Sequence, residues 1–511
     1  MAAGLAISVS LLTLLPYLLA RQATPPGWVF SGFLLNPYDG FSYLAKMRQG
    51  FDGGWLFTLP YAAEPGQPAL LFLFYLVLGH IARLTGLSLG SSFHLARVLT
   101  GSLMFLTVYA LLERLPLARA GRWCAYALAL GISGLGWIGI AVGVSSSDLL
   151  IPESVPWLAV LVNPHFPLAA TAICLGFLAA LLPQPFWRAG LVAALAGLVL
   201  GVIQPFLLGP LWLVLGAWIL LEYGMAHRER AAPRMPRGPV TALVASALAG
   251  APWVIYDAWL VANHPVLREW SIQNLTPSPS PLAYLIGFGP LLVWGAVGLV
   301  RARPFDQPPM RLITLWSVIG FAVLYAPFGL QRRLSLGLAI PLVALAGLGI
   351  ERVCRTPARA RLAVIGTLLL TLPSLLLVGL AGVSSASEAG SATLLSGDEV
   401  AAYAWMADHV TAGSLVLAAE QTGNRIPAWL GARVLAGHPF ETPNAAGAID
   451  WIEGAFNWSG DPATGASLLR ERGIDFVYVG RAEQALGAPT WLASLEPVFM
   501  SDEVRLYAVM P

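Results

Sequence analysis

Charged residues are scarce in this chain of 511 residues, where Asp, Glu, Lys and Arg make up 11% and hydrophobic residues 57%. A soluble domain carries roughly twice that charged fraction, about 25%. The mean hydropathy of +0.71 points the same way. These values exclude an ordinary soluble enzyme and predict a polytopic α-helical membrane protein.

Cysteine is also scarce, and the three cysteines, Cys124, Cys174 and Cys354, lie in or beside hydrophobic segments. None falls in the C-terminal tail, so no disulfide framework supports it. The seven histidines form neither an HxxxH pair nor a Cys-His cluster, and the sequence therefore shows no zinc-site pattern. Neither GxxxxGKS/T nor a strand-linked GxGxxG occurs, so we expect no direct use of a cytoplasmic nucleotide.

The small net charge of +2 hides an uneven distribution. Residues 383–511 contain 6 Arg and 15 Asp or Glu, whereas the rest of the chain contains 23 basic and 12 acidic residues. Basic loops between hydrophobic segments indicate cytoplasmic loops, not a nucleic-acid partner. The sequence thus predicts a transmembrane domain over residues 1–382 and a separate acidic domain over residues 383–511.

Eleven hydrophobic runs have roughly the 17–25 residues that a membrane crossing needs. They are residues 4–20, 95–112, 122–143, 163–182, 188–204, 206–223, 239–262, 283–301, 311–329, 334–350 and 361–382. The apolar stretch 69–84 is predicted to lie on the outer surface instead, because only then do four basic loops all face the cytoplasm. These loops carry Arg114, Arg119 and Arg122; Arg228, Arg230, Arg234 and Arg237; Arg301, Arg303 and Arg311; and Arg352, Arg355, Arg359 and Arg361.

This topology places the N-terminus inside and gives a long first outer loop over about residues 21–94. It places the C-terminal domain outside the cytoplasmic membrane. In that domain the pattern predicts helices at 398–409, 446–456 and 464–472, and strands at 414–420, 433–436, 474–479 and 504–509. Such a mixture is typical of a small α/β domain.

Residues 36–50 of the first outer loop, NPYDGFSYLAKMRQG, predict a short helix at a membrane surface. Asn36 can cap its start, Pro37 suits its first position and Gly50 suits its end. One helical face then carries Asp39, Tyr43, Lys46 and Gly50. The carboxylate of Asp39 can act in catalysis, or it can serve only to favour the dipole near the helix start.

Other polar residues lie where a substrate could meet the membrane. Arg332 and Arg333 lie on the predicted outer side and can bind a phosphate bidentately, unless they anchor lipid headgroups or form a local ion pair. Asp257 falls inside a predicted span, where a carboxylate either serves function or snorkels to the surface. His165 either faces a cavity or caps a helix.

Four further candidate residues lie in two of the predicted outer loops. The loop 263–282 carries Gln273 and Asn274, which are candidates for substrate binding. Asp52 and Glu64 share the first loop with Asp39, and each is either its partner or a solvated loop charge. Loops of this length are usually functional.

The order of these features resembles the GT-C superfamily of membrane glycosyltransferases, and the resemblance covers most of the chain. It rests on Asp39 followed by Tyr43 in a long first outer loop, a surface helix, and the segment FHLAR (93–97) leading into the second span. Many spans and an outer α/β domain complete it. The segments GNRIP (423–427) and GHPF (437–440) look like segments of bacterial members of that superfamily.

The resemblance implies a sugar donor carried on a polyprenyl phosphate, transfer outside the cytoplasmic membrane and a catalytic role for Asp39. The superfamily often pairs two acids, as DE or DxD, whereas Gly40 follows Asp39 here. A divalent metal and the assignment of the base therefore stay open. The candidate substrate-binding residues are Tyr43, Lys46, Glu64, His165, Asp257, Gln273, Asn274, Arg332 and Arg333.

Transfer from a lipid phosphate needs a base for the acceptor hydroxyl and cations for the departing phosphate. Asp39 fits the first role, and Arg332 and Arg333 fit the second. We therefore expect a multi-pass enzyme of the inner membrane that contacts membrane lipid and transfers a hexosyl or pentosyl group, with inversion, to a glycan, lipid or protein. The alternatives are a lipid or sugar transporter or flippase, which usually has repeated halves, and a non-catalytic polysaccharide-binding envelope protein.

Overall fold

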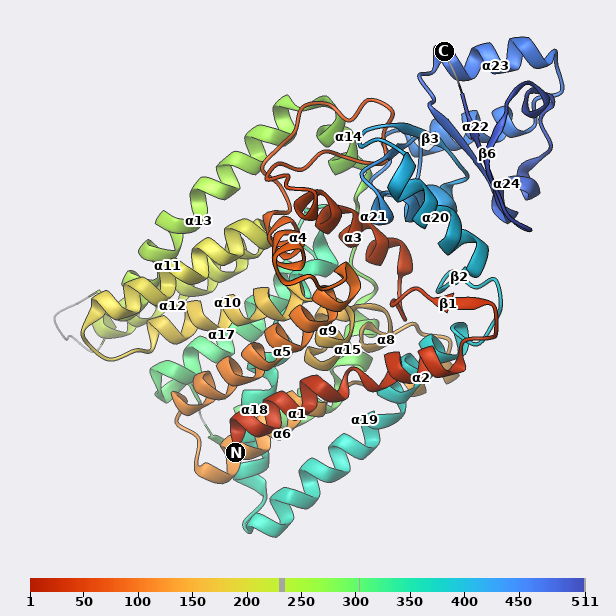
Figure 1. Ribbon diagram of the computed structural model, residues 1–511. Helices are drawn as coiled ribbons and strands as arrows, with labels where there is room; N and C mark the ends of the chain where they lie inside the picture. The colour runs from red at the N-terminus through yellow and green to blue at the C-terminus, as the bar shows by residue number, and fades with distance from the viewer. Residues whose placement is uncertain (229–234, 303, 510–511) are drawn as a thin grey trace. The chain divides into compact units, whose positions relative to one another are not determined.

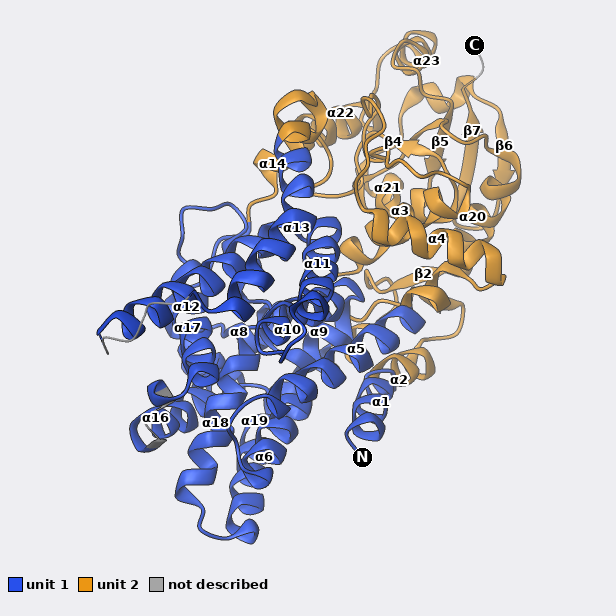
Figure 2. Cartoon of the chain, turned by 90° about the vertical axis from the view of Figure 1, so that its left-hand side faces the viewer, with its two compact units in different colours: residues 1–15, 94–258, 276–381 blue, residues 16–93, 259–275, 382–511 orange. Residues whose placement is uncertain are grey.

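The computed structural model describes residues 1–228, 235–302 and 304–509, which form two compact units (Figure 2). Unit 1 contains residues 1–15, 94–258 and 276–381, and unit 2 contains residues 16–93, 259–275 and 382–511. Unit 2 thus combines most of the predicted first outer loop with the acidic tail. Three arginines used to predict the topology, Arg230, Arg234 and Arg303, lie outside the described residues.

Unit 1 is built of helices (Figure 1). The helices that lie wholly or mainly in it are α1 (Ala2–Leu12), α5 (Leu89–Glu113), α6 (Arg119–Gly131), α7 (Gly136–Ala141), α8 (Ser147–Leu150), α9 (Pro156–Val162), α10 (His165–Ala180), α11 (Phe186–Ile203), α12 (Leu208–Arg228), α13 (Arg237–Asn263), α15 (Pro281–Gly287), α16 (Gly289–Ala302), α17 (Pro308–Val323), α18 (Ala339–Val353) and α19 (Pro357–Ser385), with the 3-10 turns η1 (Pro152–Ser154), η2 (Pro205–Leu207), η3 (Pro304–Asp306) and η4 (Gln331–Ser335).

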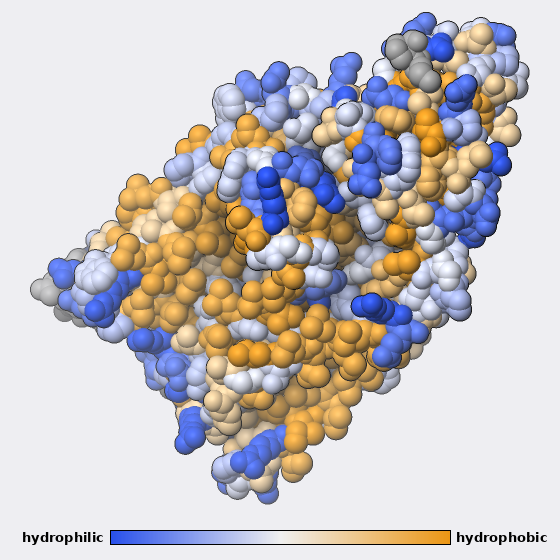
Figure 3. Space-filling model, in the orientation of Figure 1, coloured by the Kyte–Doolittle hydropathy of each residue, from blue (hydrophilic) through white to orange (hydrophobic). Residues whose placement is uncertain are grey.

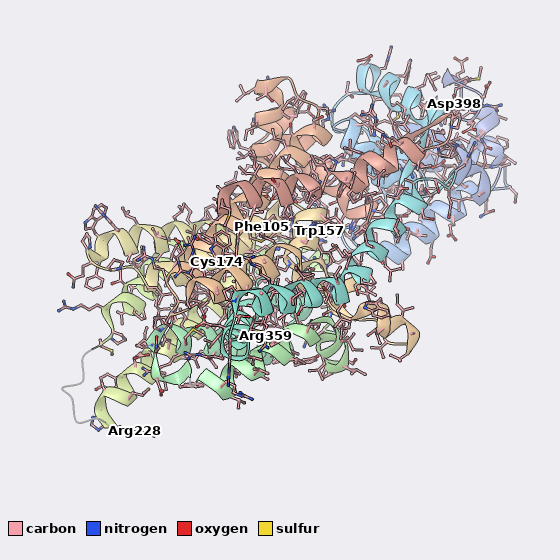
Figure 4. The ribbon with its side chains drawn as sticks, turned by 90° about the horizontal axis from the view of Figure 1, so that it is seen from below. Phe105, Trp157, Cys174, Arg228, Arg359 and Asp398 are labelled. Atoms are coloured by element: carbon pink, nitrogen blue, oxygen red, sulfur yellow. The ribbon has the colours of Figure 1, made fainter. Side chains whose placement is uncertain are left out.

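Helix α18 forms the centre of unit 1, since every residue from Ala339 to Ile350 is buried. It packs against α6, α16 and α17. Phe105 of α5 and Cys174 of α10, labelled in Figure 4, are fully buried in the same apolar core. The cysteine therefore acts as a small apolar side chain, as predicted.

Several helices of unit 1 are apolar on their exposed sides as well, so that hydrophobic residues cover much of the surface in Figure 3. On α19 the exposed side chains include Leu362, Ile365, Leu369, Leu376 and Leu380. A helix that is hydrophobic all round is suited to lipid. The structure has seven helices long and apolar enough to cross a membrane within the described residues, or eight if the bent pair α15 and α16 is one span.

The predicted count of eleven spans is therefore supported only in part. Seven predicted runs lie in the seven long helices, and the run 283–301 is the pair α15–α16, bent by 81°. The runs 163–182 and 311–329 form the shorter helices α10 and α17, of 16 residues each. The run 122–143 is not one helix, because α6 ends at Gly131 and α7 begins at Gly136.

The break in the run 122–143 has a local cause. The buried Asp148 carboxylate accepts hydrogen bonds from the backbone N–H groups of Gly134 and Gly136, at 3.0 Å each. A side chain that binds the backbone in this way offers it an alternative to the helical hydrogen-bond ladder. Apolar composition alone does not show that a side chain will bind the backbone in this way. The sequence therefore predicted a continuous span.

Unit 2 is a mixed α/β unit. Its helices are α3 (Pro37–Phe51), α4 (Leu73–Thr85), α14 (Pro265–Gln273), α20 (Gly397–His409), α21 (Glu420–Trp429), α22 (Ala445–Phe456), α23 (Pro462–Glu471) and α24 (Arg481–Leu486), with the 3-10 turn η5 (Thr490–Ser494); α2 (Leu15–Ala23) lies at its start. Its strands are β1 (Trp28–Phe30), β2 (Leu394–Ser396), β3 (Leu415–Leu417), β4 (Arg433–Val434), β5 (Phe476–Val479), β6 (Pro497–Met500) and β7 (Arg505–Ala508).

Five of these strands form one sheet in the order β4-β3-β5-β7-β6. Strand β3 pairs in parallel with β4 and β5, and β7 pairs antiparallel with β5 and β6. Strands β1 and β2 pair antiparallel in a separate ribbon, which joins the first outer loop to the tail. The helices and strands that the sequence predicted in the tail are confirmed at α20, α22, α23, β3, β4, β5 and β7, whereas α21, α24 and β6 were not predicted.

Helices α3 and α4 pack closely because glycines face each other's backbone. A Cβ on Gly50 would lie 2.0 Å from the carbonyl oxygen of Leu76, and one on Gly79 would lie 1.9 Å from that of Met47. The predicted role of Gly50 as a helix stop is therefore wrong, since α3 continues to Phe51. Helix α4 has 13 residues, about 20 Å at 1.5 Å per residue. It is thus shorter than the roughly 30 Å core of a bilayer, as expected for a surface helix.

Candidate active site around Asp39

Helix α3 presents Asp39 in its first turn. The preceding Asn36 has a left-handed backbone conformation (φ 45°) and makes no side-chain capping bond to the helix, unlike the predicted cap. Its side-chain amide instead donates to Asp39 Oδ2 at 2.6 Å. One oxygen of the carboxylate is thereby fixed by the residue that begins the helix.

The other oxygen of Asp39 is held by His438, from the loop between β4 and α22. The His438 Nε2 atom lies 3.0 Å from Asp39 Oδ1. The His438 Nδ1 atom accepts from the backbone N–H groups of Phe440 and Glu441, at 3.2 Å each. Since Nδ1 is an acceptor, Nε2 carries the ring proton and donates it to the carboxylate.

This pair is enclosed on one side and open on the other. The His438 side chain is 4% exposed, whereas the Asp39 side chain is 39% exposed. The ring of Tyr61 lies 6.1 Å from the imidazole, centre to centre, and is nearly parallel to it. The carboxylate therefore has a fixed orientation and remains accessible to a ligand.

A second contact between α3 and the same loop lies one to two turns further along the helix. The Lys46 ammonium binds Glu441 Oε1 and Oε2 at 2.8 and 3.0 Å, and it also donates to Ser42 Oγ. Ser42 Oγ in turn donates to Glu441 Oε1 at 2.8 Å. Asp39, Ser42 and Lys46 share one helical face, at positions i, i+3 and i+7, and all three contact residues 438–441.

Lys46 was predicted to bind substrate, and the structure gives it a 1% exposed side chain directed at Glu441. Its ammonium also lies 4.4 Å from the centre of the Phe72 ring, a cation–π arrangement. Burial acts to raise the pKa of Glu441, but the Lys46 ammonium and the hydrogen bonds from Lys46 and Ser42 hold that pKa below its ordinary value. The pair is therefore ionised and internal, and it fixes the loop that carries His438.

The loop is braced from two more directions. Gly437 and His438 donate their backbone N–H groups to Thr442 Oγ1, at 3.1 Å each. Gln273, at the end of α14, donates to the Thr442 carbonyl at 3.0 Å. The predicted substrate-binding residue Gln273 thus lies beside the Asp39 cluster, and the adjacent Asn274 follows the end of α14.

The other candidates in unit 2 have different surroundings. The Tyr43 ring stacks on that of Tyr75, with centroids 4.5 Å apart. Glu64 is exposed in the loop before α4. Asp52 follows the end of α3 and lies 3.6 Å from Arg48. Thirteen residues separate Asp39 from Asp52, about 20 Å along the helix, so these carboxylates do not share one site.

The remaining four candidates belong to unit 1. His165 is buried at the start of α10, and Asp257 is half-buried in the last third of α13. Arg332 and Arg333 are adjacent in η4, where Arg332 is exposed and Arg333 half-buried. The backbone N–H of Arg332 donates to the carbonyl of Thr276 at 3.1 Å, which ties this turn to the start of the segment before α15.

Sequence reasoning missed the partners of Asp39 and Lys46. His438 and Glu441 lie about 400 residues from α3 in the sequence. The only signal was the GHPF segment at 437–440, which contributed to the family resemblance without a role. No periodicity links residues at that separation.

The possible divalent metal was tested against the same residues. Among the residues that the structure describes, no three His, Cys, Asp or Glu side chains come together as a ligand set. Asp39 and His438 supply two such groups, and each already contacts the other. A divalent metal at this position would need ligands beyond these two side chains.

No protein-family model matches this chain, and no curated protein does so either. Solved structures do match. The oligosaccharyltransferase of Archaeoglobus fulgidus in its apo form aligns with a TM-score of 0.54 at 13% identity, covering 99% of this chain and 74% of that one. ArnT from Cupriavidus metallidurans aligns with a TM-score of 0.55 at 14% identity, covering 100% and 98%.

A third similar structure is the arabinofuranosyltransferase AftD from Mycobacteria, with a TM-score of 0.58 at 16% identity over 98% of this chain and 40% of that one. The three are GT-C glycosyltransferases, and the likeness extends over nearly the whole chain. At these identities the likeness concerns the fold. The fold of this multi-pass membrane protein is therefore that of the GT-C glycosyltransferases, as the sequence predicted.

Proposed function

We propose that the protein transfers a sugar from a polyprenyl-phosphate-linked donor to an acceptor, with Asp39 as the general base. The observation that carries the proposal is the Asp39 carboxylate in a GT-C fold, held by Asn36 and His438 yet 39% exposed. A carboxylate that is oriented in this way and partly desolvated can take a proton from a hydroxyl. No catalytic role is needed for Asp52 or Glu64.

The reaction is a single displacement. Asp39 accepts the proton of the acceptor hydroxyl as its oxygen attacks the anomeric carbon of the sugar. The bond from that carbon to the phosphate oxygen breaks, and the lipid phosphate leaves with the electron pair. A phosphate leaving group needs little protonation, so no second acid is required, and attack from the opposite face inverts the anomeric configuration.

The donor class is supported by two related structures. ArnT of Cupriavidus metallidurans has been solved with undecaprenyl phosphate, and the archaeal oligosaccharyltransferase with dolichol-phosphate and an inhibitory peptide. We extend a lipid-phosphate donor to this chain, and a glycan, lipid or peptide acceptor.

We further propose that transfer occurs outside the cytoplasmic membrane. The basic loops between the spans support a cytoplasmic location of those loops, which puts residues 383–511 on the opposite side. The strand pair β1–β2 and the contacts of α3 with residues 438–441 support the proposal that the candidate base and the tail share that side. We assign residues 1–382 and 383–511 to the transmembrane and extracytoplasmic domains on this basis.

Arg332 and Arg333 are the proposed cations for the lipid phosphate. Replacing both with Gln is expected to weaken donor binding, because each charge-assisted contact contributes about 1.5–3 kcal/mol. The measurement is donor affinity in detergent, with Arg433→Gln as a control, since Arg433 binds the backbone carbonyls of Gly413 and Ala63. Unchanged affinity in the double variant would assign the pair to headgroup anchoring.

His438 is the proposed positioning residue for Asp39. His438→Ala is expected to lower kcat by about 10–100-fold, the rate equivalent of one hydrogen bond to a charged group. It should also move the acid limb of the pH–rate profile to higher pH, because the lost bond favoured the ionised carboxylate. His438→Gln retains a donor of similar reach and should restore part of both effects. A lower rate with an unmoved pH profile would mean that His438 only supports the loop.

The function itself is tested with purified protein and a panel of labelled polyprenyl-phosphate hexoses and pentoses. We expect at least one donor to lose its sugar to an added glycan, lipid or peptide acceptor. NMR of the product should then show the anomeric configuration opposite to that of the donor. A product of retained configuration would exclude the single displacement.

A further inference from the structure

A second candidate site lies in unit 2, in a cavity with a volume of about 220 Å³. It is bordered by the β1–β2 ribbon, by α20 and α21, and by α24 with the turn before β7. The side chains that bear on its chemistry are Trp28, Glu399, Gln421, Arg425, Arg481 and Glu503. The volume is below the roughly 300–1,000 Å³ of pockets for drug-sized ligands, so one small ring fits it better than a lipid.

The charges on the wall compensate one another. Arg425, which is nearly fully buried, binds Glu399 at 2.6 Å and the Leu394 carbonyl at 3.2 Å. Arg481 forms an ion pair with Glu503. Because both guanidiniums already have a carboxylate partner, the cavity offers no uncompensated cation for a phosphate or another anion.

The remaining acid of the wall is Glu483, which is fully buried. Its two oxygens accept the backbone N–H groups of Ala419 and Gly480, at 2.9 and 2.8 Å. Burial raises the pKa of this carboxyl above its ordinary value, which disfavours its charge. The wall is therefore polar, and its two guanidiniums are each compensated by a carboxylate.

The same wall carries polar groups that can hydrogen-bond hydroxyls, and it also carries an aromatic ring. The Arg481 guanidinium lies 4.9 Å from the centre of the Trp28 ring, and both side chains line the cavity. The half-buried Gln421 side chain makes no hydrogen bond to another described residue. Carboxylate oxygens, guanidinium N–H groups and an amide beside an indole suit a ring with hydroxyl groups and an apolar C–H face.

Helix α21 connects this cavity to the Asp39 cluster. Asn424 donates to the carbonyl of Tyr38, the residue before Asp39, at 3.1 Å. The neighbouring Arg425 lines the cavity, and its guanidinium lies 6.0 Å from the centre of the Phe41 ring, two residues beyond Asp39. Asn424 thus binds the residue before Asp39, and the adjacent Arg425 both lies near Phe41 and lines the cavity.

We propose that the cavity binds a neutral saccharide unit of the acceptor. The bound sugar residue would hold the glycan acceptor beside the α3 segment that carries Asp39. This inference rests on the proposed function, since it assigns the acceptor class. It makes a neutral glycan the acceptor, in preference to a phosphorylated one.

The test is isothermal titration calorimetry on full-length protein in nanodiscs, carrying Asp39→Asn so that binding is measured without turnover. The probes are neutral di- and trisaccharides of hexoses and pentoses. We expect at least one to bind, and Trp28→Ala to weaken it by about tenfold or more, as for an aromatic anchor. Gln421→Ala should weaken it several-fold, which gives a second variant that does not touch strand β1.

Trp451 provides the matched control, because its ring also lies under a guanidinium, that of Arg472 at 5.2 Å, but not at the cavity. Trp451→Ala should leave saccharide affinity unchanged. The proposal is wrong if no probe binds, if Trp28→Ala and Trp451→Ala behave alike, or if a sugar phosphate binds more tightly than its neutral sugar. Saccharide binding without any transfer by the wild-type protein would count against the proposed function alone, and transfer without such binding against the cavity alone.

Discussion

Replacing Asp39 with asparagine is expected to slow sugar transfer by about 10²–10⁴-fold, the contribution of a general base. The variant should fold and insert normally. Asparagine keeps the shape of the side chain, and its amide oxygen can still accept from His438, while the Asn36 amide can turn over to accept from the new NH2 group. The lost interaction with the helix dipole is worth only about 0.3–1 kcal/mol. The measurement is the initial rate of transfer, together with the thermal unfolding of the purified variant.

Asp52→Asn is the matched control for this experiment. Asp52 follows the end of the same helix, is also partly exposed and is paired with Arg48 at 3.6 Å. We expect its removal to leave the rate near that of the wild type. A normal rate for Asp39→Asn would reduce Asp39 to a residue of the helix start, and a greater loss for Asp52→Asn would move the base to the other end of α3.

Replacing Lys46 with methionine is expected to reduce the free energy of unfolding by about 3–5 kcal/mol, because Glu441 would keep a buried charge without its partner. The double variant Lys46→Met, Glu441→Leu should recover most of that loss, since it removes both charges. Arg48→Met is the control on the same helix, because its pair with Asp52 is much less buried, with side chains 24% and 43% exposed, and surface pairs contribute about 0–1 kcal/mol. Denaturation in detergent gives all the values, and equal losses for Lys46→Met and Arg48→Met would contradict the buried pair.

The same pair makes stability depend on pH. The folded pKa of Glu441 is held below its ordinary value of 4.5. The stabilisation is therefore complete above about pH 4.5 and is lost as the pH falls through the lowered folded pKa. Wild-type protein should lose stability over that acidic range, and Lys46→Met should lose less, because the pair no longer contributes.

Much of the α3 site could be predicted from the sequence, because its features are local. The helix, its Pro37 start and the shared face of Asp39 and Lys46 follow from spacing within fifteen residues. The partners on that face could not be predicted, because His438 and Glu441 come from a loop about 400 residues away. Only the tertiary structure shows that Lys46, which was predicted to bind substrate, instead forms a buried ion pair with Glu441.

The tail shows the same limit. Helix α20 was predicted at residues 398–409, and the structure shows that Ser396 and Glu399 form a capping box at its start. Asp398, labelled in Figure 4, adds a second acid to that first turn. Helix α21 was not predicted, because it contains Gly423 and Pro427. Gly423 is needed there since a Cβ would lie 2.1 Å from the Ala436 carbonyl oxygen, a contact that local propensity does not report.

The most direct test of the proposed function separates cleavage of the donor from its transport. Purified wild-type and Asp39→Asn proteins are reconstituted in liposomes with a panel of labelled polyprenyl-phosphate sugars and an acceptor in excess. We expect the wild-type protein to release polyprenyl phosphate and label the acceptor, and the Asp39→Asn protein to do so about 10²–10⁴-fold more slowly. Movement of intact donor across the bilayer without cleavage by either protein would contradict a glycosyltransferase and identify a transporter.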